Sequence, residues 1–89
     1  MTASGAAEAL RLALLCRGVV QGVGFRPAVH RLATALELSG SACNVGGGVW
    51  LELVGPRERL EQFLALLPVS MPEGARLEPL QPSWLPGGE

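Results

Sequence analysis

The chain has no lysine, no aspartate and no tyrosine among its 89 residues. Without lysine it has no Schiff-base nitrogen and no lysine to hold a nucleotide phosphate, and without aspartate it has no Ser-His-Asp triad. A single histidine, His30, and two cysteines, Cys16 and Cys43, cannot supply four ligands to a structural zinc ion without carboxylates or a second chain. The composition therefore predicts no metal site.

Charge and long apolar runs are also scarce. The formal net charge is −1, which gives no long-range attraction toward nucleic acid or an acidic membrane surface. No apolar run reaches the roughly 18 residues of a membrane span, and the first residues lack the basic start of a signal peptide. Two cysteines 27 positions apart are typical of reduced thiols. We therefore expect a cytoplasmic protein without a nucleic-acid or membrane partner.

The hydrophobic content of 48% and the mean hydropathy of +0.32 predict a folded chain, and the length allows one small domain. Residues 1–8 are rich in small side chains and are expected to be disordered. The folded domain is expected over 9–80, and a tail rich in proline and glycine over 81–89.

Hydrophobic periodicity predicts the order β-α-β-β-α-β. The expected elements are a strand over 9–17, a helix over 27–38, a short strand over 41–44, a strand over 48–54, a helix between Pro56 and Pro68, and an edge strand from Arg76. Each helix has one apolar stripe, so both should cover the same face of one mostly antiparallel sheet. This is a ferredoxin-like α/β sandwich.

The loop before the first helix carries three glycines, Gly18, Gly22 and Gly24. Glycines let successive backbone N–H groups point inward, and the helix that follows presents its positive end, so the loop is suited to bind a tetrahedral anion. Arg26, at the helix start, can close over two oxygens of the same anion. The alternative is an ordinary tight turn followed by a surface arginine.

Asn44 is the second residue that the topology selects. The helix over 27–38 and the strand over 41–44 run in opposite directions, so Asn44 should return to the level of Arg26. A carboxamide beside a bound phosphate can hold a water molecule by accepting one hydrogen bond and donating another. An asparagine before a glycine-rich turn is also, on its own, a common turn former.

Taken together, these residues resemble the acylphosphatase family. The shared pattern is Gly18-x-Val20-Gln21-Gly22-Val23-x-Phe25-Arg26, with Asn44 and a glycine-rich turn eighteen residues after the arginine. The likeness covers roughly residues 10–80. Within the family, Gly24-Phe25-Arg26-Pro27 and Gly46-Gly47-Gly48 look most similar to the N-terminal acylphosphatase-like domain of the carbamoyltransferase that matures nickel–iron hydrogenases.

The resemblance implies metal-independent hydrolysis of a small acyl phosphate to a carboxylate and inorganic phosphate. We expect a monomer that needs no cofactor. The main-chain amides of Gln21, Gly22, Val23, Gly24 and Phe25 would bind the phosphoryl group together with Arg26, and Asn44 would position the attacking water. One alternative is a detached hydrogenase-maturation domain that acts on carbamoyl phosphate and contacts other maturation proteins. Another is a catalytically degenerate binding module.

Some positions depart from the family pattern. Ser41 and Ala42 stand where an aromatic and a β-branched residue are usual, Glu37 replaces a common glycine, and Val45 replaces a polar turn residue. We therefore expect a looser domain, with lower stability and activity than a typical relative. His30 is expected to be a partly exposed structural residue, and Trp50 to lie on the open face of the sheet.

Overall fold

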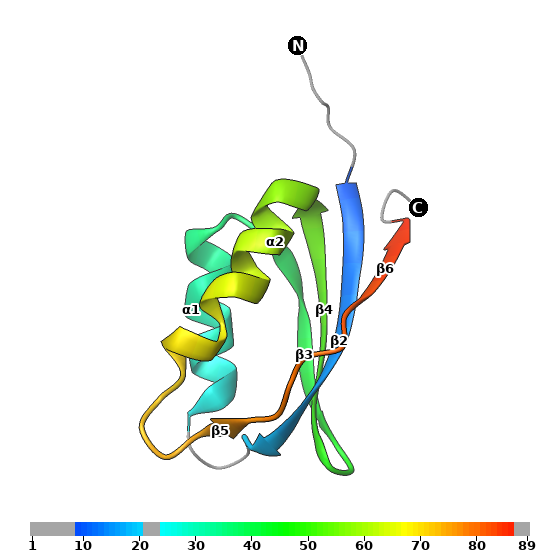
Figure 1. Cartoon of the computed structure of the whole chain (residues 1–89). Helices are drawn as coiled ribbons and strands as arrows, with labels where there is room; N and C mark the ends of the chain where they lie inside the picture. The colour runs from blue at the N-terminus through cyan, green and yellow to red at the C-terminus, as the bar shows by residue number, and fades with distance from the viewer. Residues whose placement is uncertain (1–8, 21–23, 87–89) are drawn as a thin grey trace.

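The computed structural model describes residues 9–20 and 24–86. Its strands are β2 (Ala9–Val19), β3 (Ser39–Val45), β4 (Gly48–Pro56), β5 (Arg76–Leu77) and β6 (Ser83–Pro86); its helices are α1 (Phe25–Ala35), α2 (Arg57–Leu66) and the short 3-10 helix η1 (Pro68–Ser70). The sheet has the order β3-β4-β2-β5, and β6 also pairs with β2. Figure 1 shows α1 and α2 on one face of this sheet, which confirms the predicted sandwich. No described helix is both long and apolar enough to cross a membrane.

The core forms where the sheet meets the two helices. On β2 the alternate residues Leu12, Leu14 and Cys16 are almost fully buried, as their period of two predicts. Their partners across the ladder are Leu53, Leu51 and Val49 of β4, which are buried as well. The largest helix side chains in this core come from Phe25, Leu60, Phe63 and Leu67. Burial of each large side chain contributes about 1.5–3 kcal/mol to folding.

Helix α1 begins two residues earlier and ends three residues earlier than the helix expected over 27–38. At its start Gly24 has a φ of 82°, a conformation that favours glycine, and the helix begins with the next residue. At its end Glu37 takes a left-handed φ of 60°. The N–H of Glu37 donates to the carbonyl of Thr34 at 3.0 Å, and that of Leu38 to Ala33 at 2.8 Å. This closing pattern of hydrogen bonds ends the helix before residue 38.

The C-terminal part of the chain differs from the expected elements. A single edge strand from Arg76 was expected, but β5 ends at Leu77, and Pro79 cannot donate a ladder hydrogen bond. The chain then pairs with β2 again through β6, opposite residues 10–13. Residues 83–86 are therefore a strand and not part of a tail. Trp84 of β6 packs against the core, and the Arg57 guanidinium lies 4.3 Å from the centre of its ring. Residues 1–8 and 87–89 lie outside the described ranges.

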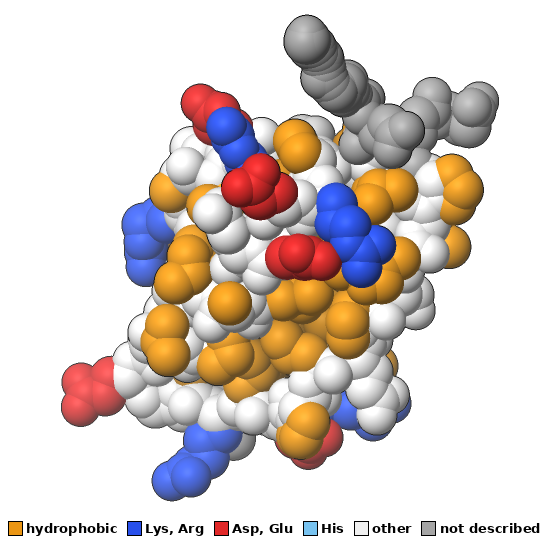
Figure 2. Space-filling model, turned by 45° about the horizontal axis from the view of Figure 1, so that its top comes forward, with side chains coloured by type: hydrophobic (Ala, Val, Ile, Leu, Met, Phe, Trp, Pro, Cys, Tyr) orange, Lys and Arg blue, Asp and Glu red, His pale blue; other side chains and the backbone are white. Residues whose placement is uncertain are grey.

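Helix α2 and the segment that carries β5 and β6 cover one edge of the core. Their partly buried apolar side chains are Leu64, Met71, Leu77, Leu80 and Trp84. Figure 2 shows hydrophobic side chains gathered between charged ones on the side of the molecule that faces the viewer. This edge closes the core on the side opposite to β3.

Candidate active site

One end of the molecule brings together three chain segments that carry the predicted site residues. Strand β2 ends at Val19, α1 begins at Phe25 and β3 ends at Val45. Strand β4 lies between β2 and β3 and is antiparallel to both, so β2 and β3 run in the same direction. They therefore end at the same end of the sheet. Figure 1 shows that α1 begins at this end as well.

Arg26 lies in the first turn of α1, and its side chain is exposed. None of the ion pairs among the described residues includes it. The first turn holds no acidic residue, and within the described chain Gly24 gives the helix no side-chain cap. The partial positive charge at the start of the helix and the positive charge of the guanidinium therefore lie close together, which favours the binding of an anion there.

The predicted phosphate loop is described only in part. Gln21, Gly22 and Val23 lie outside the described residues. Gly24 and Phe25 are described, and Phe25 is 1% exposed because its ring fills the core below the helix start. Any contact of Phe25 with a bound anion therefore has to come from its main chain.

The pairing of β3 with β4 determines which way Asn44 faces. Asn44 lies directly opposite Val49, and Val49 lies directly opposite Cys16 of β2. Residues that lie opposite each other in an antiparallel ladder project to the same face. Since Val49 and Cys16 are buried under the helices, Asn44 projects to the helix side of the sheet. It shares that side, and that end of the molecule, with the start of α1.

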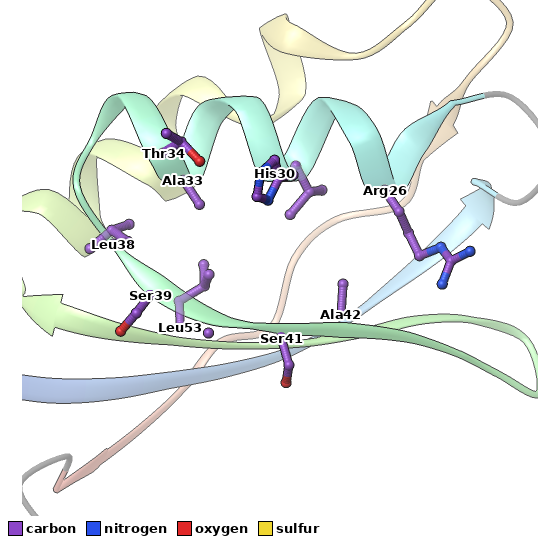
Figure 3. Close-up of a pocket in the computed structure, with 11 residues that line it drawn as sticks. Arg26, His30, Ala33, Thr34, Leu38, Ser39, Ser41, Ala42 and Leu53 are labelled. Atoms are coloured by element: carbon purple, nitrogen blue, oxygen red, sulfur yellow. The ribbon is translucent and has the colours of Figure 1, made fainter.

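A groove of about 280 Å³ lies between α1 and β3. Its apolar wall comes from Val29, Ala33, Leu38, Ala42 and Leu53. Figure 3 shows Arg26 at one end of this groove, Ala42 pointing toward α1, and Thr34 and Leu38 at the far end. His30 lies on the α1 side of the groove and is exposed. No sequence pattern indicates this groove, because it depends on how a helix and a strand pack together.

The two cysteines lie on opposite faces of the sheet. Cys16 is fully buried, and burial raises the pKa of its thiol to about 11. Cys43 is exposed and lies opposite Trp50, on the face away from the helices. The indole of Trp50 donates a hydrogen bond of 2.9 Å to the carboxylate of Glu52 on the same face. As expected, Trp50 is therefore on the open face, away from the candidate site.

Similar proteins were found by sequence and by structure. A family model described as Acylphosphatase matches residues 12–87. The acylphosphatase of Caldivirga maquilingensis is 35% identical over 78 residues, which cover 81% of this chain and 82% of that protein. Carbamoyltransferase HypF2 of Cupriavidus necator is 44% identical over 69 residues, which cover 78% of this chain but 9% of that protein.

The fold matches solved structures as well. The structure of an acylphosphatase from Coxiella burnetii aligns with a TM-score of 0.79 at 26% identity, over 88% of this chain and 82% of that one. The family match extends past residue 80 and so includes β6, which the sequence pattern had assigned to a tail. The match over most of the chain and the relatives of similar length show that this chain belongs to the acylphosphatase family of enzymes.

Proposed function

We propose that the chain hydrolyses small acyl phosphates to a carboxylate and inorganic phosphate, with Arg26 and Asn44 as its catalytic residues. The observation that carries this proposal is the placement of both residues at one end of the helix side of the sheet, beside the start of α1. Membership of the acylphosphatase family supports the reaction type.

The guanidinium of Arg26 and the main-chain amides of residues 21–25 bind the phosphoryl oxygens. A guanidinium offers two parallel N–H donors to two oxygens of one phosphate, and the helix start adds its partial positive charge. Charge stabilisation and positioning are the main requirements for phosphoryl transfer, because the transition state is loose. Arg26 therefore stabilises the charge on the transferring group.

Asn44 positions the water. Its carboxamide oxygen accepts a hydrogen bond from the water and its amide group donates one, which aims the water oxygen at phosphorus. The water oxygen bonds to phosphorus while the bond from phosphorus to the acyl oxygen breaks. The carboxylate leaves with the electron pair of that bond. One proton of the water passes to another oxygen of the phosphate, and the second proton stays on the oxygen that attacked phosphorus. No protein side chain has to act as a strong base.

Replacement of Arg26 by alanine tests the phosphate contact. We expect Arg26→Ala to lower kcat/KM for an acyl phosphate by roughly 10²–10³-fold and to weaken inhibition by inorganic phosphate. Arg31→Ala is the control, because Arg31 is an exposed arginine on the same helix and outside the groove. Equal effects of the two substitutions would contradict the assignment of Arg26.

Replacement of Asn44 by alanine tests the water contact separately. We expect Asn44→Ala to lower kcat by roughly 10²-fold while inorganic phosphate still inhibits at a similar concentration. Cys43→Ala is the control, since the neighbouring Cys43 is exposed on the opposite face of the sheet. If Asn44→Ala weakens phosphate inhibition as much as turnover, Asn44 binds phosphate and does not position water.

A second candidate function follows from the similarity to Carbamoyltransferase HypF2, of which the chain spans 9%. In this case carbamoyl phosphate is the substrate, and hydrogenase-maturation proteins are partners. The rates of hydrolysis of acetyl phosphate, benzoyl phosphate and carbamoyl phosphate separate the two functions. A chain that turns over none of the three would be a binding module that has kept the fold without the activity.

A further inference from the structure

Strand β3 forms one edge of the sheet, and among the described strands it pairs with β4 alone. Edge strands are usually protected against pairing with other chains by charged side chains, prolines, bulges or a short length. The seven residues of β3 include no charged side chain and no proline, and their register with β4 is continuous. The other side of the sheet ends in β5 and β6, which have only two and four residues. Strand β3 is therefore the edge of the described sheet that a further strand can extend.

The register of β3 shows which of its main-chain groups face outward. Val45 and Gly48 close a two-residue loop, and such a closing pair is hydrogen-bonded. Every second residue of β3 therefore bonds to β4, and the N–H and C=O groups of the residues between them point away from the sheet; these residues are Gly40, Ala42 and Asn44. No loop, cap or side-chain hydrogen bond of the described residues involves them. They offer a row of donors and acceptors to an added strand.

The groove of about 280 Å³ lies between α1 and this same edge (Figure 3). His30 and Thr34 of α1 line it and are exposed, so the groove is open to solvent. Paired strands lie about 4.8 Å apart, and residues opposite each other project to the same face. Alternate side chains of a strand added beside β3 would therefore enter the groove. Apolar side chains suit its wall, which is formed by Val29, Ala33, Leu38, Ala42 and Leu53.

Charge determines which extended segment fits. No acidic side chain lines the groove among the described residues, and Arg26 and His30 are its basic groups. Figure 3 shows Arg26 at one end of the groove, and none of the ion pairs of the described residues includes it. A carboxylate at this end of an added strand would pair with the guanidinium. Since β3 ends beside Arg26, the carboxylate belongs near the N-terminal end of an antiparallel segment.

We propose that β3 and this groove bind a partner protein through an extended acidic segment, which adds an antiparallel strand to the sheet. The segment carries a glutamate or aspartate beside Arg26, followed by apolar side chains at every second position. Main-chain hydrogen bonds to β3 provide the affinity, and the side chains that enter the groove provide the specificity. The inference depends on the edge, the groove and the charge of Arg26, and on no step of the proposed reaction.

A synthetic peptide, acetyl-Glu-Ser-Val-Thr-Leu-Thr-amide, tests the edge in the unmodified protein by isothermal titration calorimetry. Its Glu, Val and Leu side chains face the groove, so the main-chain N–H groups of Val and Leu face β3. N-methylation of these two residues should weaken binding about tenfold or more. N-methylation of the two threonines is the matched control, because their N–H groups face solvent, and it should change Kd less than about threefold. Equal losses, or no binding of the unmodified peptide up to about 1 mM, would overturn the inference.

A double-mutant cycle tests the predicted charge pair. Arg26→Gln in the protein, or Gln in place of Glu in the peptide, should each weaken binding about fivefold. The two changes together should cost no more than either alone, because each removes the same interaction. Losses that multiply in the double variant would show that the carboxylate does not lie beside Arg26, and would overturn the proposed orientation of the segment.

Substitution at Ala42 tests the edge from the side of the protein. Ala42→Pro removes an N–H that points outward and leaves the hydrogen bonds to β4 in place, as edge strands allow. It should weaken peptide binding about tenfold, whereas Ala42→Ser, which keeps the N–H, should change Kd less than about threefold. Equal effects would contradict the proposal. The methylated peptides test the same hydrogen bonds if Ala42→Pro does not fold.

The other occupant to consider is a second copy of this chain. Sedimentation of the protein alone at increasing concentration should show a monomer, because the acidic end that the groove favours is absent from β3 itself. A dimer that Ala42→Pro dissociates would mean that β3 pairs with its own copy, and would overturn the assignment of the edge to an acidic partner segment.

Discussion

The guanidinium of Arg59 on α2 forms an ion pair with the carboxylate of Glu37, just beyond the end of α1. The same Arg59 nitrogen donates a hydrogen bond of 3.2 Å to the carbonyl of Leu36. One side chain of the second helix therefore binds two groups at the end of the first. Because the last carbonyls of a helix have no partner within it, this contact stabilises the end of α1 and connects the two helices.

This ion pair predicts a dependence of stability on pH. The hydrogen bond from Arg59, and then its positive charge, lower the pKa of Glu37 from its ordinary value. A carboxyl group whose pKa is lowered by folding stabilises the fold fully above its unfolded pKa, about 4.3, and loses this contribution as the pH falls through the folded value. We expect the free energy of unfolding of Glu37→Gln to decrease less than that of the natural sequence between pH 5 and pH 3. Parallel decreases in the two proteins would contradict this contribution.

The backbone of Glu37 gives a second prediction. Its φ of 60° lies in the left-handed region, which costs a residue with a Cβ about 1 kcal/mol relative to glycine. Glu37→Gly and Glu37→Ala both remove the carboxylate, so the difference between them reports the backbone alone. Glu37→Gly is expected to be the more stable of the two by about 1 kcal/mol, or roughly 4 °C in Tm. Equal melting temperatures would show that the left-handed conformation carries no strain.

Strand β6 gives a third prediction. Trp84 is partly buried against the core and lies beneath the Arg57 guanidinium, so Trp84→Ala removes apolar contact and a cation–π interaction. We expect a loss of about 2 kcal/mol in the free energy of unfolding. The neighbouring Leu85 is 44% exposed and projects to the other face, so Leu85→Ala should cost less than about 1 kcal/mol. Similar small losses in both variants, measured by denaturant unfolding, would show that residues 83–86 do not stabilise the fold.

The two thiols should react very differently. Cys43 is exposed, whereas burial raises the pKa of Cys16 to about 11 and also blocks access to it. At pH 8 a thiol reagent is expected to modify one cysteine per folded chain rapidly, and the second only after denaturation. Mass spectrometry of the modified peptides identifies which cysteine reacted. Rapid modification of Cys16 in the folded chain would mean that the core around it opens readily.

Much of the fold could be predicted, because its main signals are local. The alternation of Leu12, Leu14 and Cys16 indicates a strand with one buried face, whichever strands it pairs with. Strand β6 gives no such signal. Its four residues pair with residues 10–13 of β2, whereas β5 pairs only with residues 18 and 19. Its pairing depends on residues 10–13, which lie 70 to 76 positions earlier in the chain. Local pattern therefore predicts β2 and misses β6.

Some features of the candidate site could also be predicted from the local sequence, and others could not. The glycine-rich loop and the helix start mark Arg26 in the sequence, and chain direction predicts that Asn44 returns to the same end of the molecule. The face on which Asn44 lies cannot be predicted locally, because Ser41, Ala42 and Cys43 show no clear apolar alternation. It follows from the pairing of Asn44 with Val49. The groove beside the site depends on short side chains from two elements and is visible only after they pack.

The fate of the water oxygen tests the central claim most directly. Hydrolysis of benzoyl phosphate in water enriched in heavy oxygen, followed by mass spectrometry of both products, shows which atom the water attacks. Attack on phosphorus by a water that Asn44 positions predicts the label in inorganic phosphate, and a much slower incorporation at the same atom in Asn44→Ala. Label in the benzoate, or incorporation that is equally fast without the Asn44 carboxamide, would contradict the account.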